Sequence, residues 1–209
     1  MMTEQTVAIE KIRNPVKRPV LDAVAERWSP RAFADTPVDK EVLLSLFEAA
    51  RWAASSYNEQ PWRFMIATKE DEAGYTKLLS CIRDSNRSWA KSAPVLILSI
   101  AKTTFSNTDG TNNHARHDLG AAVAQLTLEA TSRDLYLHQM AGIHPDKARG
   151  LYEVSDDYDV VAAIALGYLG ELEQLPEDLQ KKELRERERK PLEELVFEEK
   201  FGESSSFVK

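Results

Sequence analysis

The sequence predicts a single domain of mixed helices and strands, in which several helices surround one sheet of roughly four strands. Three observations support this prediction. Apolar residues recur at helical spacing in two long segments, two short runs of branched apolar residues are typical of buried strands, and no linker rich in Gly, Ser or Pro divides the 209 residues. A chain of this length can bury a substantial core.

The first elements follow from local breaks in the pattern. Residues 1–19 carry charges and two prolines, so we expect an irregular lead-in. A short helix is expected over 20–27, because Ser29-Pro30 interrupts its apolar pattern. The next helix is expected to begin at Asp39, a good N-cap residue, and to continue to about Ala54.

A polar loop follows that helix and leads into a strand. Residues 55–61 read Ser-Ser-Tyr-Asn-Glu-Gln-Pro; the small polar side chains compete for backbone hydrogen bonds, and the proline disfavours a helix before it. Residues 62–67 have strand-like composition. A loop held at both ends can present hydroxyl and amide groups to a ligand, but this segment alone also fits an ordinary helix-to-strand connection.

The rest of the chain alternates between helical and strand patterns, with one long loop rich in Thr, Asn, Asp and Gly. The expected elements are a polar helix over 70–83, a buried strand over 93–100, the loop over 102–113, a helix over 119–130, a strand over 135–140, a helix over 146–152, a buried strand over 160–166 and a charged helix over 176–190.

Two arginine-rich segments lie near opposite ends of the chain. Residues 27–31 place two guanidinium groups and a hydroxyl close together, and residues 185–190 contain three arginines and a lysine ahead of Pro191. Guanidinium groups grip phosphate with paired donors. A solvated basic turn is the alternative interpretation of the first segment.

The sequence lacks the motifs of several other common kinds of functional site. The sequence has no Gly-x-Gly-x-x-Gly or P-loop pattern and no Gly-x-Ser-x-Gly elbow. Cys81 is a single cysteine, and His114 and His117 have no clear third ligand, so we expect no disulfide and no metal. The arginine segments, the polar loop and a turn at Gly142 together suit a bulky, planar cofactor that carries a phosphate.

Charge and hydropathy restrict the partners. A formal net charge of -7 argues against a general nucleic-acid binder. The longest apolar run, residues 93–101, is far shorter than a membrane span, and the N-terminus lacks the apolar core of a signal peptide. We therefore expect a cytoplasmic protein without a membrane or nucleic-acid partner.

In their order and spacing, the motifs resemble those of the nitroreductase family of FMN-dependent oxidoreductases, over nearly all of the chain from about Val20 to Gly202. The motifs that carry the resemblance are Arg27-x-Ser29-x-Arg31-x-Phe33, Ala54-Ser55-Ser56-x-Asn58-x-Gln60-Pro61-Trp62, Ala93-Pro94, Asp118-Leu119-Gly120, Ala141-Gly142, Leu166-Gly167-Tyr168 and Arg187-x-Arg189-Lys190-Pro191.

The resemblance implies an α+β fold with three layers, α/β/α, in which helices flank a central, mostly antiparallel sheet. It implies one FMN-binding domain over residues 20–202, followed by a tail at 203–209. The segment from about residue 191 would be an arm exchanged between the subunits of a homodimer, with FMN at the interface in two equivalent sites.

The same resemblance implies roles for individual residues. Arg27 and Ser29, joined by Arg187 and Arg189, would bind the phosphate end of FMN. Arg31 would approach the pyrimidine edge, where its charge stabilises anionic reduced flavin. Trp28 would contribute its backbone, and Asn86 would contact the pyrimidine ring. Met140, Ala141 and Gly142 would lie beside the flavin N5. The polar loop would contribute Ser55, Ser56, Asn58 and Gln60, and of these Ser55, Ser56 and Asn58 would reach the flavin from the other subunit.

The implied activity is a ping-pong reaction in which NADH or NADPH gives hydride to FMN and leaves. A nitroaromatic, quinone or other electron-poor acceptor then enters the same cleft. No catalytic side chain is expected, because the flavin carries the chemistry. An FMN-binding sensor, carrier or chaperone without general turnover is an alternative, as is a flavin-destroying or dehalogenating branch of the same fold.

Overall fold

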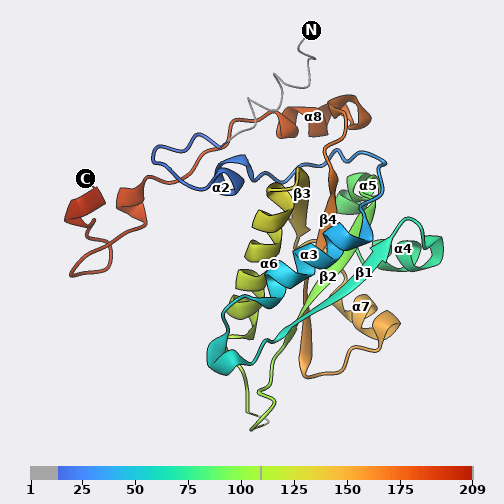
Figure 1. The fold of residues 1–209 in the computed structure, drawn as a ribbon, viewed down its shortest axis with the longest axis horizontal. Coiled ribbons are helices and arrows are strands. Elements are labelled where there is room, and N and C mark those ends of the chain that lie inside the picture. The colour runs from blue at the N-terminus through green and yellow to red at the C-terminus, as the bar shows by residue number, and fades with distance from the viewer. Residues whose placement is uncertain (1–13, 109, 209) are drawn as a thin grey trace.

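A computed structural model describes residues 14–108 and 110–208 (Figure 1); the first thirteen residues of the expected lead-in lie outside this range. The elements are α2 (Asp22–Glu26), α3 (Lys40–Arg51), β1 (Trp62–Thr68), α4 (Glu72–Leu79), α5 (Asp84–Ala90), β2 (Val95–Lys102), α6 (Ala115–Thr131), β3 (Leu135–Met140), α7 (Pro145–Tyr152), β4 (Tyr158–Tyr168) and α8 (Glu177–Glu183), with 3-10 turns at Ser56–Asn58, Leu172–Gln174, Leu192–Glu194 and Ser206–Val208.

One four-stranded sheet lies at the centre, with the strand order β1-β2-β4-β3 and antiparallel pairing throughout. The run expected to form a buried strand is β2, whose residues from Val95 to Ala101 are all buried. Because successive side chains of a strand point to opposite faces, Leu96 and Leu98 belong to one core cluster and Ile97 to the other.

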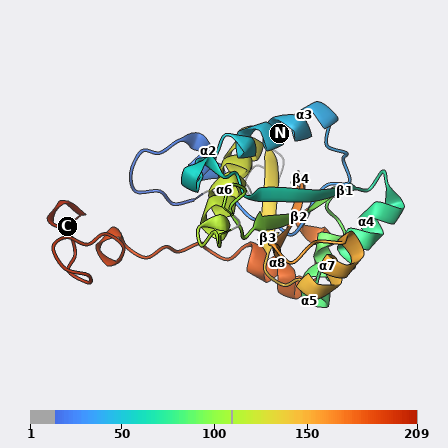
Figure 2. The same ribbon diagram turned by 90° about the horizontal axis from the view of Figure 1, so that it is seen from below.

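Helices cover both faces of the sheet, which confirms the predicted three-layer α+β fold (Figures 1 and 2). On one face, α3 and α6 bury residues such as Leu46 and Leu126. On the other face lie α4, α5 and α7, which bury Leu78, Trp89 and Ala148. The α3 helix begins as predicted, because the Asp39 carboxylate accepts a hydrogen bond from the Glu41 amide at 2.7 Å.

Several helix boundaries differ from the sequence predictions; α6, for example, begins at Ala115 and not at 119. Three of the differences change the path of the chain. The α3 helix ends at Arg51, before the predicted Ala54, because the backbone is already extended at Ser55. The polar helix predicted over 70–83 ends at Leu79, and α5 follows as an additional helix that the sequence analysis did not predict. Between them Ile82 leaves the helical path to form a β-bridge with Ile143.

The third difference lies in the charged C-terminal segment. Its helix α8 ends at Glu183, whereas the charge pattern predicted a helix to residue 190. Beyond α8 the chain runs away from the body of the domain as an arm (Figures 1 and 2). Large apolar side chains on this arm face solvent: Leu192 is 50% exposed, Leu195 55% and Phe201 92%. Within the described ranges, no helix has both the length and the apolar character needed to cross a bilayer.

The segment after α2 runs along the ends of β4 and β3. The Ala34 amide donates to the Tyr168 carbonyl, and the Gly170 amide donates to the Ala32 carbonyl, each at 3.0 Å. On β3, His138 Nδ1 lies 2.9 Å from the Pro30 carbonyl oxygen. Since a carbonyl only accepts, Nδ1 carries the proton of this hydrogen bond. The His138 ring also packs on Trp89, with 4.5 Å between ring centroids.

Burial, with a smaller contribution from the charge of Arg31, lowers the pKa of His138 to about 4, although hydrogen bonds to the Pro30 and Ser29 backbone act in the opposite direction. In the unfolded chain a histidine has its ordinary pKa near 6.5. Between these values the unfolded state binds more protons than the folded state. The free energy of unfolding therefore falls as the pH drops from about 6.5 to about 4, and this loss is complete below the folded-state value.

His138→Gln is expected to flatten this pH dependence, because glutamine retains a donor for Pro30 but does not titrate. The wild-type protein is expected to lose up to about 3 kcal/mol more than the variant across this pH window. Urea unfolding at a series of pH values measures the difference. His117→Gln is the control, since the His117 side chain is 82% exposed; equal slopes for wild type and His138→Gln would contradict the expectation.

Candidate functional site

Side chains from the two arginine-rich segments meet beside α2. Arg27 Nη1 donates to Ser29 Oγ at 3.2 Å, and Arg187 Nη1 donates to the Arg27 carbonyl at 2.9 Å across 160 residues of sequence. Burial lowers the pKa of Arg27, and the nearby guanidinium of Arg189 lowers it further by a smaller amount. The fold thus gathers three guanidinium groups and one hydroxyl, which we call the arginine cluster.

The arginine cluster concentrates positive charge. Burial first, and then the charges of Arg27 and Arg189, lower the pKa of Arg187 to about 10. Arg187 Nη2 is buried and has no hydrogen-bond partner among the described residues. Leaving a buried charged donor unpaired is costly. An anion with several acceptor oxygens would remove both this cost and the mutual repulsion, and a phosphate has that chemistry.

Arg31, from the same segment, has a different partner. Glu183, in the last turn of α8, accepts hydrogen bonds from both the Arg31 amide and the Arg31 guanidinium, the latter at 2.9 Å. The guanidinium carbon also lies 5.9 Å from the centroid of the Trp89 ring. Arg31 is therefore held by an ion pair and an aromatic ring and is separated in its bonding from the arginine cluster.

The predicted turn at the end of β3 lies next to α5. The Arg83 amide donates to the Gly142 carbonyl at 2.9 Å. A Cβ atom placed on Gly142 would come within 2.6 Å of Asn86 Nδ2, so this glycine allows the α5 side chain to approach the turn closely. Met140 is buried, whereas Ala141 is exposed. The structure thus brings Asn86 together with Gly142.

Residues of the arginine segment and of the Gly142 turn lie one after another along the edge strand β3. Trp28 packs its ring edge-to-face on Tyr136, at 6.2 Å between centroids, and Pro30 bonds to His138 two residues further along. Gly142 follows the end of the strand. Seven residues, from Tyr136 to Gly142, span at most roughly 20 Å when extended. This arrangement suits an elongated ligand with an anionic group at one end. The Trp28 side chain itself is in the core, 8% exposed, which leaves only its backbone for a ligand.

The polar loop has an unusual backbone. Tyr57, Asn58 and Gln60 have positive φ values of 52°, 55° and 52°, a region that side-chain-bearing residues seldom occupy. Hydrogen bonds hold it there: the buried Asp118 carboxylate accepts from the Ser56 amide at 2.9 Å, and Ser55 Oγ accepts from the Gln60 amide at 3.0 Å. Asp118, in the first turn of α6, thus fixes this loop.

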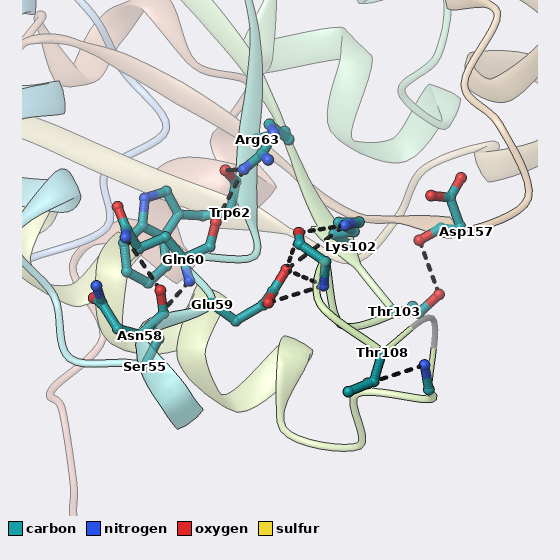
Figure 3. A network of polar contacts seen from close by, with 12 residues as sticks. Ser55, Asn58, Glu59, Gln60, Trp62, Arg63, Lys102, Thr103, Thr108 and Asp157 are labelled. Atoms are coloured by element: carbon teal, nitrogen blue, oxygen red, sulfur yellow. Dashed lines mark hydrogen bonds and ion pairs between the residues drawn. The ribbon is translucent and has the colours of Figure 1, made fainter.

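A second network joins the polar loop to the long loop after β2 (Figure 3). The Glu59 carboxylate accepts from the amide and the hydroxyl of Ser106, and its side chain is only 8% exposed. Lys102 Nζ lies 3.6 Å from the same carboxylate. The Ser106 hydrogen bonds, followed by Lys102, lower the pKa of Glu59.

One protomer does not bring the polar loop to the arginine cluster. The loop is next to the start of β4, because Lys102 pairs with Tyr158, whereas the segment of the arginine cluster bonds to Tyr168 at the other end. The eleven residues of β4 span roughly 35 Å. Within one protomer, the two groups of predicted residues therefore lie at opposite ends of β4.

Two further features lie away from these residues. An open groove of about 600 Å³ between α3 and α6 is lined by Leu44, Trp52 and neighbouring polar residues, none of them predicted to bind a cofactor. In the described ranges, no group of three or more His, Cys, Asp or Glu side chains is arranged to hold a metal ion.

The residues present fit FMN on two observations. The buried, unpaired Arg187 Nη2 in the arginine cluster fits a phosphate. Further along β3, the turn at Gly142 has no side chain and has no room for one beside Asn86, so its backbone is open to a ring system. Sequence reasoning missed Glu183, His138 and the loop contact of Asp118. Glu183 lies in a segment of almost continuous charge, where no pattern distinguishes a buried carboxylate from exposed ones.

Comparisons with known proteins agree with this fold. A model of the Nitroreductase family matches residues 24–168. A crystal structure described as an oxidoreductase containing FMN superposes with a TM-score of 0.85 at 34% identity, covering 90% of this chain and 96% of that one. An uncharacterized 15.4 kDa protein from the ask 5' region of Mycolicibacterium smegmatis is 33% identical over 147 residues, 67% of this chain and 97% of that protein.

A shorter similarity connects the chain to a named enzyme. Nitrobenzene nitroreductase from Ectopseudomonas oleovorans is 41% identical over 49 residues, which cover 23% of this chain and 22% of that enzyme. The family match alone spans well over half of the chain. The chain therefore belongs to the nitroreductase family and is an oxidoreductase of the nitroreductase type.

Proposed function

We propose that this protein is an FMN-dependent NAD(P)H oxidoreductase that reduces nitroaromatics, quinones or other electron-poor acceptors by a ping-pong mechanism. The observation that carries the proposal is the buried Nη2 of Arg187, which has no hydrogen-bond partner among the described residues and lies close to two further arginines in a chain of the nitroreductase family. When bound, FMN would supply the chemistry, accepting hydride from a nicotinamide and passing electrons to the acceptor in a second half-reaction.

The chain's own residues would bind and orient the cofactor. Arg27, Arg187 and Arg189, with Ser29, would hold the phosphate, because charge-assisted hydrogen bonds to its oxygens satisfy the donors left open in the arginine cluster. Further along β3, Asn86 and the turn Met140–Gly142 would contact the ring system. Trp28 would contribute its backbone, and Arg31 would lie at the pyrimidine edge together with its partner Glu183.

We further propose that the site is completed by a second copy of the chain. Ser55, Ser56, Asn58 and Gln60 of one protomer would face the arginine cluster of the other, because β4 separates the two groups within one protomer. The exposed apolar side chains of the arm, beginning at Leu192, supply surface for such a dimer. Their position on a segment that leaves the domain suits an arm exchanged between subunits (Figure 2).

An FMN-binding sensor or carrier is the second candidate, since the arginine cluster would bind FMN equally well without turnover. Anaerobic addition of nicotinamide separates the two. We expect the purified yellow protein to lose its flavin absorbance on addition of NADH or NADPH, and to regain it when a nitroaromatic or a quinone is added. A flavin that stays oxidised with both nicotinamides would favour the sensor or carrier.

Substitutions in the arginine cluster test phosphate binding. Arg27→Ala and Arg187→Ala are each expected to weaken FMN binding by about tenfold to a hundredfold, because a charge-assisted contact contributes on the order of 1.5–3 kcal/mol. Riboflavin, which lacks the phosphate, is expected to bind wild type and variants alike in fluorescence titrations.

Arg185→Ala is the matched control for these variants, because it removes the same charge from an exposed neighbouring position. It is expected to change FMN affinity little. A loss of FMN affinity that is equal for Arg185→Ala and Arg187→Ala, or equal for FMN and riboflavin, would show that the arginine cluster does not bind the phosphate.

The dimer has its own test. Multi-angle light scattering is expected to give twice the 23.6 kDa chain mass for the wild type. Leu192→Ser with Leu195→Ser is expected to weaken the dimer, because both side chains are half-exposed apolar groups on the arm. Leu151→Ser, on α7 and 38% exposed, is the control. A flavin-loaded wild-type monomer would contradict the shared site.

A further inference from the structure

Glu183 is one of two buried carboxylates among the described residues, the other being Asp118. It is 4% exposed, although it lies in a segment whose other charged residues mostly face solvent. A buried carboxylate is stable only when its oxygens are satisfied. Arg31 does this with two donors, its backbone amide on one oxygen and its guanidinium on the other.

The ion pair is positioned between the two ends of the proposed flavin site. Arg31 is two residues from Ser29 in the arginine cluster, and its guanidinium lies over Trp89. Trp89 is on α5, the short helix that also carries Asn86 beside Gly142. The pair therefore lies where the ring system of a bound FMN would follow its phosphate along β3.

The charge of this pair matters because reduction adds negative charge to a flavin. A free guanidinium near the ring would favour the reduced form strongly, since the interaction of charges in a partly buried site is much stronger than in water. An arginine already paired with a carboxylate presents little net charge. Glu183 would thus decide how much of the Arg31 charge the flavin experiences.

We propose that Glu183 is a positioning residue that holds Arg31 beside the flavin ring and, by neutralising it, keeps the reduction potential of the bound flavin low. This inference rests on the proposed FMN function. It adds a determinant of the redox potential that lies in α8, a helix that also leads directly into the residues of the arginine cluster.

A charge cycle at the pair tests the proposal. The midpoint potential of protein-bound FMN is measured by anaerobic spectrophotometric titration against reference dyes for wild type, Glu183→Gln, Arg31→Gln and the double variant. Glu183→Gln is expected to raise the potential, because Arg31 then keeps its full charge. Arg31→Gln is expected to lower it when the titration is run at a pH high enough to keep the unpaired Glu183 ionised, because burial favours the protonated carboxyl. The double variant, which is neutral like the intact pair, is expected to return towards the wild-type potential.

Glu186→Gln is the matched control, because it removes one negative charge from an exposed site three residues along the chain. It is expected to leave the potential near that of wild type. An unchanged or lowered potential in Glu183→Gln, or a rise of the same size in Glu186→Gln, would overturn the proposal. If Glu183→Gln does not fold, the comparison of Arg31→Gln with the double variant decides, and equal potentials in these two would overturn it.

Failure of this inference and failure of the proposed function are distinguishable. A wild-type protein that binds no FMN in fluorescence titration would defeat both. A wild-type protein that binds FMN and is bleached by a nicotinamide, but whose potential does not respond to the charge cycle, would leave the function standing and remove the role of Glu183.

Discussion

The mutual repulsion of three guanidinium groups is the constraint on which the rest of the structure depends. Arg27, Arg187 and Arg189 are brought together from opposite ends of the chain, partly out of water, with one buried nitrogen unpaired. Such an arrangement costs folding free energy unless an anion completes it. We propose that the phosphate of FMN is this anion.

The two buried carboxylates have parallel roles in the fold. Glu183 holds the N-terminal arginine segment through Arg31, and Asp118 holds the polar loop through the Ser56 amide. Each carboxylate thus fixes one of the two segments proposed to bind FMN, and the two segments lie at opposite ends of β4. We propose that a second copy of the chain brings the two segments together at one site. The open groove of the single protomer lies elsewhere, between α3 and α6.

Sequence patterns predicted the strands and most of the helices well, because those elements depend on local periodicity, whereas the three-layer arrangement was implied by the family resemblance. The strands β1 to β4 and helices α3, α6 and α7 lie where alternation, helical spacing or a cap such as Asp39 predicted them. The helix α5 was missed because its seven polar and aromatic residues have no apolar stripe. The end of α8 was misplaced because the charge pattern continues while the backbone leaves the helix to bring Arg187 to Arg27.

For the site, the sequence predicted which residue types were available but not how they are paired. The convergence of Arg27 and Arg187 was implied only by family resemblance, since 160 residues separate them. The pairing of Arg31 with Glu183 had no signal, because tertiary structure alone determines which of many acidic side chains is buried. Likewise, the left-handed backbone at Tyr57 and Gln60 could not be foreseen from residues that seldom adopt it.

The central claim is that the arginine cluster binds a phosphate as its dianion, and phosphorus NMR of the FMN-loaded protein tests it most directly. Phosphate monoesters ordinarily take up a proton near pH 6. Three guanidinium groups are expected to hold the bound phosphate as the dianion, so its chemical shift is predicted to stay constant between about pH 5 and pH 8. A bound phosphate that titrates in this range as free FMN does would contradict the account.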